Sequence, residues 1–147
     1  MSPVLIFDTD HLVILQRESE AESSRIRDKM SRFATSDFFV TIVSFHEQVA
    51  GWYDHLAKAK KQRDVVFAYG MFREVLTDFK ALQVLDYYDL AAATFASFVK
   101  QRIRVGTMDL RIASIAVAND MTLLTRNTVD FQRVPGLRFE DWTLQRG

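Results

Sequence analysis

Short apolar segments that alternate with longer amphipathic ones restrict the fold of this sequence more than any other feature. A short and nearly continuous apolar run is typical of a strand that is buried on both faces, as in parallel sheets. Such runs cover residues 4–7, 38–43, 83–86 and 122–125, and a turn at Pro135-Gly136 precedes one more short segment, 137–139. The pattern therefore predicts an α/β fold with a mostly parallel sheet of four to five strands, covered by helices on both faces.

The stretches between these runs predict the helices. Ile26, Met30 and Phe33 recur at helical spacing within residues 19–33, where Ser23 or Ser24 can begin the helix. Ser44 stands in an N-cap position with Glu47 three residues later, the spacing of a capping box. We also expect two helices within 45–79 with a break near Arg63-Asp64, a helix over 89–101, another from 109, and an apolar turn at 12–15.

The composition is that of a water-soluble chain with the size of one domain. The 147 residues are 48% hydrophobic and 26% charged, and the 19 basic and 19 acidic residues cancel, so no global positive charge attracts nucleic acid. Cysteine is absent, which excludes disulfides, thiolate metal sites and a cysteine nucleophile. Because Asp8 interrupts the first apolar run, we predict neither a signal peptide nor a membrane span. We expect a single cytoplasmic domain over residues 1–147.

Four acidic residues stand at corresponding places along the chain, just after strands or in the first turns of helices. Asp8 ends the first strand, and Glu47 lies in the first turn of the helix after the second strand. Asp109 opens the helix after a Gly-Thr-Met connector, and Asp130 follows the fourth strand. Ligands of open α/β sheets bind beyond the carboxyl ends of the strands. We therefore expect these four carboxylates to converge.

Converging carboxylates repel one another, so something must compensate their charge. Mg²⁺ and Mn²⁺ prefer oxygen ligands, and such an ion can also activate water against a phosphodiester. Three of the four acids also have a structural interpretation when taken alone, whereas Asp8, directly after a buried strand, would be costly to bury without a partner. Glu47 and Asp109 fit helix N-termini, where an acid stabilises by about 0.3–1 kcal/mol, and Asp130 fits an ordinary turn. Only the joint pattern favours a metal-dependent phosphodiesterase.

Other polar residues keep two interpretations at this stage. The hydroxyls of Thr9, Ser44 and Thr125 can orient carboxylates, or they can serve turns and helix caps. The three histidines lack a metal-binding spacing, and we expect them to be surface or partly buried residues: His11, His46 and His55. Two cationic groups, Arg102 with Arg104 and the cluster 58–63, are either solvated faces or a rim that holds phosphates. For the cluster 58–63 we favour the solvated interpretation.

Four motifs, in this order, resemble those of the PIN-domain ribonucleases, and within them the VapC-like toxins of bacterial toxin–antitoxin pairs. The resemblance extends over essentially the whole chain, and the last motif is the most specific. The motifs are Leu-Ile-Phe-Asp8-Thr-Asp10, Ser44-Phe-His-Glu47, Gly106-Thr-Met-Asp109 and Thr125-Arg-Asn127-Thr-Val-Asp130. The resemblance implies a three-layer α/β/α PIN-like fold and a Mg²⁺- or Mn²⁺-dependent endoribonuclease.

Carried over by position, the resemblance assigns roles to eight residues. The metal-binding and catalytic acids would be Asp8, Glu47, Asp109 and Asp130. The supporting polar residues would be Thr9, Ser44, Thr125 and Asn127. The family often has asparagine two residues after its first acid, whereas this chain has Asp10. Whether Asp10 joins the metal shell is left open by the sequence.

The resemblance also implies partners. Toxins of this kind cleave RNA, are held inactive by a cognate antitoxin whose tail covers the acidic pit, and commonly form homodimers. We expect an apolar groove for the antitoxin near Trp52, Tyr53, Phe67 and Phe72, although these residues equally suit a core or a homodimer face.

Two alternatives remain from the sequence. A PIN-like scaffold can bind RNA or a partner without cutting, although that function would predict the loss of an acid and none is missing. The Asp8-Thr9-Asp10 segment also resembles the start of haloacid-dehalogenase-like phosphatases. That family expects threonine or valine where this chain has Leu12, and a late lysine, whereas no lysine follows Lys100.

Overall fold

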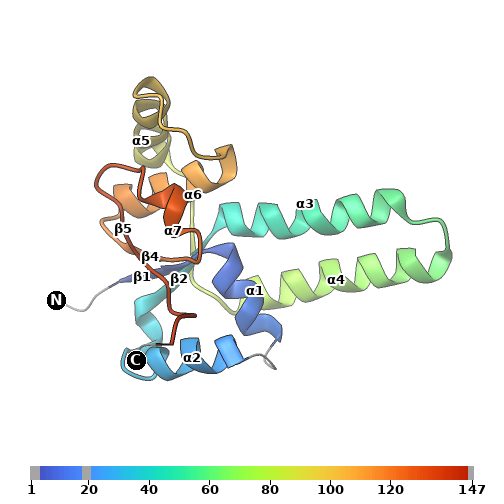
Figure 1. Ribbon diagram of the computed structural model, residues 1–147. Helices are drawn as coiled ribbons and strands as arrows, with labels where there is room; N and C mark the ends of the chain where they lie inside the picture. Colours follow the sequence, from blue (N-terminus) through green and yellow to red (C-terminus); the bar gives the residue numbers. More distant parts are fainter. Residues whose placement is uncertain (1–3, 18–20, 146–147) are drawn as a thin grey trace.

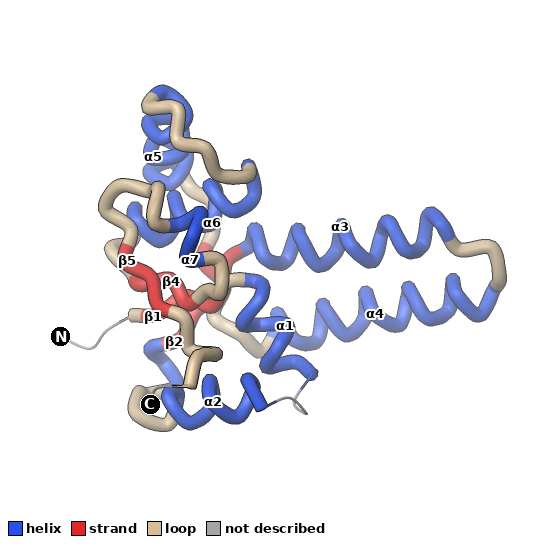
Figure 2. Tube along the Cα trace, in the orientation of Figure 1, coloured by secondary structure: helices blue, strands red, loops and turns tan. Residues whose placement is uncertain are grey.

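A computed structural model describes residues 4–17 and 21–145, in which a five-stranded sheet lies between two layers of helices (Figures 1 and 2). The sheet order is β3-β2-β1-β4-β5, and every neighbouring pair is parallel. The strands are β1 (Leu5–Phe7), β2 (Phe38–Thr41), β3 (Val84–Leu85), β4 (Thr122–Leu124) and β5 (Arg138–Glu140). The predicted α/β class with a parallel sheet is confirmed.

Seven α-helices and one short 3-10 helix connect these strands within the described residues. They are α1 (Thr9–Arg17), α2 (Ala21–Met30), η1 (Thr35–Asp37), α3 (Ile42–Lys58), α4 (Gln62–Lys80), α5 (Asp89–Lys100), α6 (Thr107–Ala118) and α7 (Thr128–Phe131). The helices α3 and α4 form a hairpin that projects to one side of the molecule (Figure 1).

Each face of the sheet carries its own hydrophobic core because successive side chains of a strand point to opposite faces. On one face, Ile6 and Leu123 pack with α5, α6 and α7. On the other face, Leu5, Phe7 and Leu124 pack with α1, α2, α4 and the buried Trp142 that follows β5. Burial on both faces explains why the strands read as continuous apolar runs rather than as alternating ones.

Several predicted boundaries are wrong by a few residues. The second strand ends at Thr41, because its hydroxyl caps α3 by accepting a hydrogen bond from the Ser44 N–H at 3.2 Å. Ser44 is therefore in the first turn of the helix rather than its N-cap. The break between α3 and α4 falls at residues 59–61, ahead of the predicted site at 63–64.

Two further predictions misplaced the first helices. Residues 12–15 belong to α1, whose inner face places Leu12 and Ile14 in the core, so they are not a turn. Ser23 and Ser24 lie inside α2 rather than at its start, and the predicted start at residue 19 lies outside the described residues. The start of α1 matters for the site, because the helix begins at Thr9, directly after Asp8.

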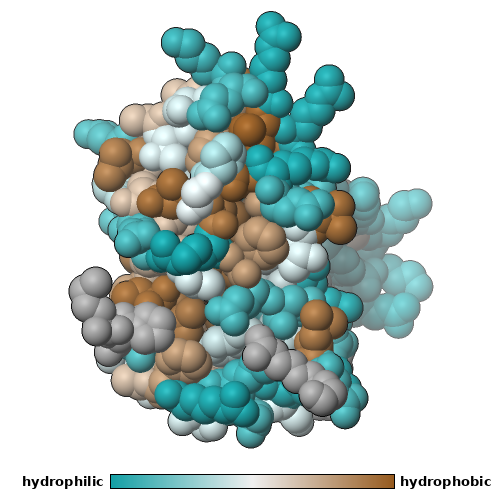
Figure 3. Space-filling model, turned by 60° about the vertical axis from the view of Figure 1, so that its left-hand side comes forward, coloured by the Kyte–Doolittle hydropathy of each residue, from teal (hydrophilic) through white to brown (hydrophobic). Residues whose placement is uncertain are grey.

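The surface mixes polar and apolar side chains. On the face in Figure 3, hydrophobic and hydrophilic residues are interspersed, and hydrophilic side chains project at the height of α5. None of the helices described is both long and apolar enough to cross a membrane.

Candidate metal centre

Asp8 occupies the centre of the sheet edge at which the parallel strands end. It follows β1, the middle strand, and its backbone N–H donates to the Leu124 carbonyl at 2.9 Å. The side chain is 4% exposed. Its Oδ1 accepts from the Thr9 N–H at 2.8 Å, and its Oδ2 accepts from the Thr125 hydroxyl at 2.7 Å. Each oxygen keeps a further lone pair with which it can bind a cation.

Glu47 reaches the same place from α3. Its Oε1 lies 2.8 Å from the Thr9 hydroxyl, which also lies 2.9 Å from the Ser44 hydroxyl. A carboxylate can only accept and each hydroxyl has one hydrogen, so Thr9 donates to Glu47 and Ser44 donates to Thr9. This chain of hydrogen bonds ties α1 to α3 and fixes the direction of the Glu47 side chain.

Asp109 and Asp130 form the other side of the site, and Asn127 joins them. Asp109 lies in the first turn of α6, and Asp130 lies in α7, which Asn127 caps. The Asn127 amide Nδ2 donates to Asp109 Oδ2 at 3.3 Å and to Asp130 Oδ2 at 3.1 Å. One side-chain amide thus uses both of its hydrogens to hold two carboxylates from two helices.

Three of the four predicted acids meet closely. One oxygen from each of Asp8, Glu47 and Asp109 lies within 4.8 Å of the other two. Asp130 is outside this group and is attached to it through Asn127. All the donor atoms are carboxylate oxygens, which suit a hard divalent cation. The group could therefore hold a metal ion.

The electrostatics of the three acids favour the binding of a cation. Burial, together with the negative charge of Asp10, raises the pKa of Asp8 from 3.8 to about 7. Burial also raises the pKa of Glu47 and of Asp109, with the charge of Asp130 adding to the second. Among the described residues, no ion pair reaches any of the three carboxylates. A bound cation would supply a compensating charge that no ion pair of the described residues provides.

Asp10 differs from these acids because the chain does compensate its charge. Burial would raise its pKa, but hydrogen bonds from His11 and from the Arg126 N–H outweigh burial, so the pKa is lowered. His11 is fully buried, so its predicted place at or near the surface is wrong. The other two histidines, His46 and His55, are exposed, as predicted. A histidine directly after an acid at a strand end was the only sequence signal that could have pointed to this pair.

Comparison with known proteins gives partial matches in sequence and nearly complete ones in structure. No family model matches the sequence. The tRNA(fMet)-specific endonuclease VapC of Shigella flexneri is 43% identical over 67 residues, which are 42% of this chain and 50% of that protein. The ribonuclease VapC2 of Rickettsia felis is 31% identical over 86 residues, 58% of this chain and 61% of that protein. The chain thus spans only about half to three fifths of the length of these relatives.

Solved structures match the fold over nearly the whole chain. The VapBC-1 structure from nontypeable Haemophilus influenzae has a TM-score of 0.74 at 19% identity and covers 96% of this chain and 99% of the matched one. The DNA-bound VapBC structure from Salmonella typhimurium has a TM-score of 0.66 at 26% identity, with 95% and 98% covered. This chain is VapC-like, in sequence over part of its length and in fold over nearly all of it. The resemblance inferred from its four motifs is confirmed.

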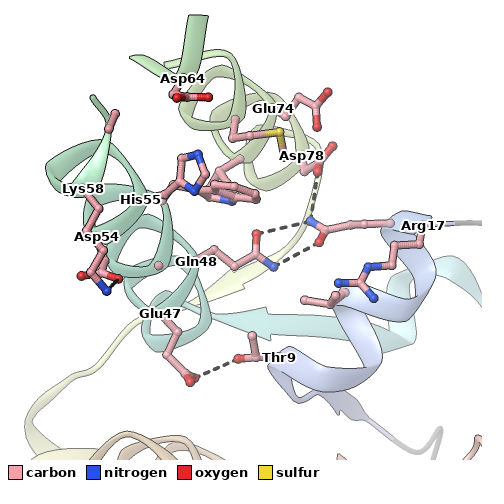
Figure 4. A pocket seen from close by; sticks show the side chains of 17 residues that line it. Thr9, Arg17, Glu47, Gln48, Asp54, His55, Lys58, Asp64, Glu74 and Asp78 are labelled. Carbon is pink, nitrogen blue, oxygen red and sulfur yellow. Dashed lines mark hydrogen bonds and ion pairs between the residues drawn. The ribbon is translucent and has the colours of Figure 1, made fainter. Parts of the chain in front are cut away.

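A cleft opens beside the acids of this VapC-like chain, between α1 and the α3–α4 hairpin (Figure 4). Its volume is about 1110 Å³, and Thr9 and Glu47 line its inner end. Gln16 of α1 bridges to Asp78 of α4 at 2.9 Å and to Gln48 of α3. The charged side chains that line the cleft are five acids and two bases, namely Glu47, Asp54, Asp64, Glu74, Asp78, Arg17 and Lys58. The cleft therefore disfavours a polyanion and favours a cationic ligand.

The apolar groove predicted on the middle helices agrees with this cleft only in part. Trp52 lines the cleft together with Val13, Met71 and Val75. Tyr53 and Phe67, in contrast, are 65% and 53% exposed and do not line it. Phe72 does not line it either.

The opposite side of the site, beyond Asp130, is cationic. Arg133 donates from Nη1 to Asp130 Oδ1 at 3.3 Å and to the Arg104 carbonyl at 3.0 Å. This fastens the connector between α5 and α6 to α7, next to the acids. Arg102 and Arg104 both lie in that connector with exposed side chains. The VapC-like chain therefore has an acidic cleft on one side of its acids and arginines on the other.

Proposed function

We propose that this chain is a metal-dependent endoribonuclease and the toxin of a toxin–antitoxin pair. The observation that carries the proposal is the close group of Asp8, Glu47 and Asp109 oxygens at the carboxyl end of a PIN-domain sheet. The names of the partial relatives, an endonuclease specific for tRNA(fMet) and a ribonuclease, support RNA as the substrate.

Mg²⁺ or Mn²⁺ is the metal that we propose for these oxygens. Such an ion, when bound, lowers the pKa of water and stabilises the charge that develops on a phosphate. Asp8, Glu47 and Asp109 would hold it, and Asp130 would add negative charge through Asn127. Thr9, Ser44, Thr125 and Asn127 orient the carboxylates by the hydrogen bonds described above.

The residues of the chain also prepare the site for the metal. The Thr125 hydroxyl and the Thr9 N–H hold the two oxygens of Asp8 in one orientation. The side chain therefore loses little conformational freedom when a cation binds. The burial of Asp8 strengthens its attraction to a cation, because charges interact more strongly in a medium of low dielectric constant.

We propose the acidic cleft as the place where a cationic segment of the antitoxin binds. Its inner end reaches Thr9 and Glu47, so an occupant would approach the metal ligands directly. The matched structures are VapBC complexes, in which an antitoxin accompanies the toxin.

The homodimer stays a prediction, which the sedimentation coefficient of the purified chain would test.

Cleavage of a labelled RNA by the purified chain tests the proposed reaction. We expect cutting with Mg²⁺ or Mn²⁺ and none with EDTA, because no ion pair within residues 4–17 and 21–145 reaches the three carboxylates. Re-addition of Mn²⁺ after EDTA should restore the activity. Binding of RNA that is not followed by cutting under any metal would instead support the non-catalytic PIN-like module.

The arginines of the α5–α6 connector should bind the phosphates of the substrate. We expect Arg102→Ala with Arg104→Ala to raise KM and to leave kcat almost unchanged. The slope of log KM against log salt should fall by about 0.7 for each phosphate contact that is lost. Lys60→Ala with Lys61→Ala removes the same charge from the connector between α3 and α4 and serves as the control. An equal effect of both double variants would show a general charge effect and reject the connector as a phosphate site.

A further inference from the structure

Two residues at the start of α1, Asp10 and His11, are not used by the proposed metal site. The His11 ring is fully buried, and its Nε2 lies 3.1 Å from the backbone nitrogen of Trp142. A backbone N–H can only donate, so Nε2 accepts and the ring hydrogen is on Nδ1. Nδ1, 2.8 Å from Asp10 Oδ1, therefore donates to that carboxylate. The ring joins the segment after β5 to the start of α1.

The second oxygen of Asp10 faces the turn that follows β4. Oδ2 accepts from the Arg126 N–H at 3.0 Å and lies 3.3 Å from the Thr125 hydroxyl oxygen. Thr125 is fully buried, donates to Asp8 and accepts from the Asn127 N–H at 3.0 Å. Asp10 thus holds the turn from which Thr125 reaches Asp8 and Asn127 reaches Asp109.

We infer that Asp10 and His11 are positioning residues, a buried pair that holds the turn after β4 in the orientation that the metal ligands need. The inference rests on the proposed metal site, but it assigns to Asp10 a place outside the metal shell. Asp10 contributes no oxygen to the group in which Asp8, Glu47 and Asp109 oxygens lie within 4.8 Å of one another, and its own two oxygens accept from His11 and from the Arg126 N–H.

The hydrogen-bond pattern requires a carboxylate at this position. Asparagine has one acceptor oxygen, so Asp10→Asn would place its NH₂ against either the Arg126 N–H or the His11 Nδ1–H. A shift of the ring hydrogen to Nε2 would only move the conflict to the Trp142 N–H. Each arrangement leaves a donor of this network unpaired, so the turn should loosen.

Calorimetric titration of the purified chain with Mn²⁺ tests the inference. We expect Asp10→Asn and His11→Leu each to weaken Mn²⁺ binding by about 10- to 100-fold, the usual effect of losing a residue that orients a metal ligand. His11→Asn keeps an amide donor near Asp10 and should recover most of the affinity. The double variant of Asp10→Asn with His11→Leu should be no weaker than the worse single variant, because both act through one contact.

Ile26→Ala is the matched control, because it removes buried volume from the core that also holds Trp142 but removes no group that makes a hydrogen bond in the pair's network. All variants are titrated below their unfolding midpoints. An equal loss of Mn²⁺ affinity in Ile26→Ala would make the effect merely structural and overturn the inference. Wild-type affinity in Asp10→Asn and His11→Leu would also overturn it while leaving the metal site intact.

Two more outcomes separate the inference from the proposed function. A loss in Asp10→Asn as complete as that in Asp8→Asn would make Asp10 a ligand and overturn the positioning role. No Mn²⁺ binding by the wild-type chain would reject the metal site itself, and the inference with it.

Discussion

Asp8→Asn should abolish RNA cleavage and Mn²⁺ binding while the fold stays intact. Asp8 is the most buried of the three clustered acids, and the amide that replaces it has no charge with which to hold a cation. We expect kcat to fall by more than about a thousandfold, since the loss of a metal ligand removes the water activation that a metal supplies. The measurement is cleavage of a labelled RNA at saturating Mn²⁺, beside a circular dichroism melt of each protein.

The amide should fit the space of the carboxylate. Its oxygen can accept from the Thr9 N–H, and its nitrogen can donate to the Thr125 oxygen, so both hydrogen bonds of Asp8 have a substitute. Asp28→Asn, an exposed acid on α2, is the control for a loss of negative charge. Cleavage by Asp8→Asn at the wild-type rate would mean that the reaction takes place elsewhere.

The metal-free chain should lose stability as the pH rises from about 4 to about 7. The pKa of Asp8 is raised from 3.8 to about 7 in the folded chain, mainly by burial, so between these values the folded state binds the proton more tightly than the unfolded state. The stabilisation is present below pH 3.8 and is lost as the pH passes the folded pKa. A shift of this size corresponds to roughly 4 kcal/mol in the free energy of unfolding.

Asp8→Asn isolates this contribution from those of the other titrating groups. Urea unfolding with EDTA should show the variant gaining stability relative to the wild-type chain as the pH rises through this range. With Mn²⁺ in place of EDTA, the wild-type chain should recover the loss, because the cation replaces the proton on Asp8. A difference between the two proteins that stays constant from pH 4 to 7 would contradict the raised pKa.

The order of strands and helices was predictable from the sequence because strands buried on both faces must read as apolar runs. Ile6 and Leu5 point to opposite cores, so neither position tolerates a polar residue. Boundaries were less predictable, since they depend on single hydrogen bonds. The Thr41 hydroxyl rather than that of Ser44 caps α3, and both residue types are good N-caps.

The place of the acids was also predictable, from their joint pattern, since each follows a strand within a few residues or lies near the start of a helix. By itself, the sequence determined that Asp8, Glu47, Asp109 and Asp130 stand at the same edge of the sheet. Only the tertiary structure decided how they differ. It brings one oxygen from each of three acids within 4.8 Å of the others. The fourth acid, Asp130 of α7, is linked to Asp109 only through the Asn127 amide, which donates to both.

The distinction between Asp8 and Asp10 likewise belongs to the tertiary structure. Two residues apart on the chain, these acids have pKa values shifted in opposite directions. The donors that compensate Asp10 come from its neighbour His11 and from Arg126, which lies 116 residues away along the chain. A local sequence pattern cannot contain that second partner. Contacts of this kind exist only once β1 and β4 have paired, and they decide which carboxylates are left for a metal.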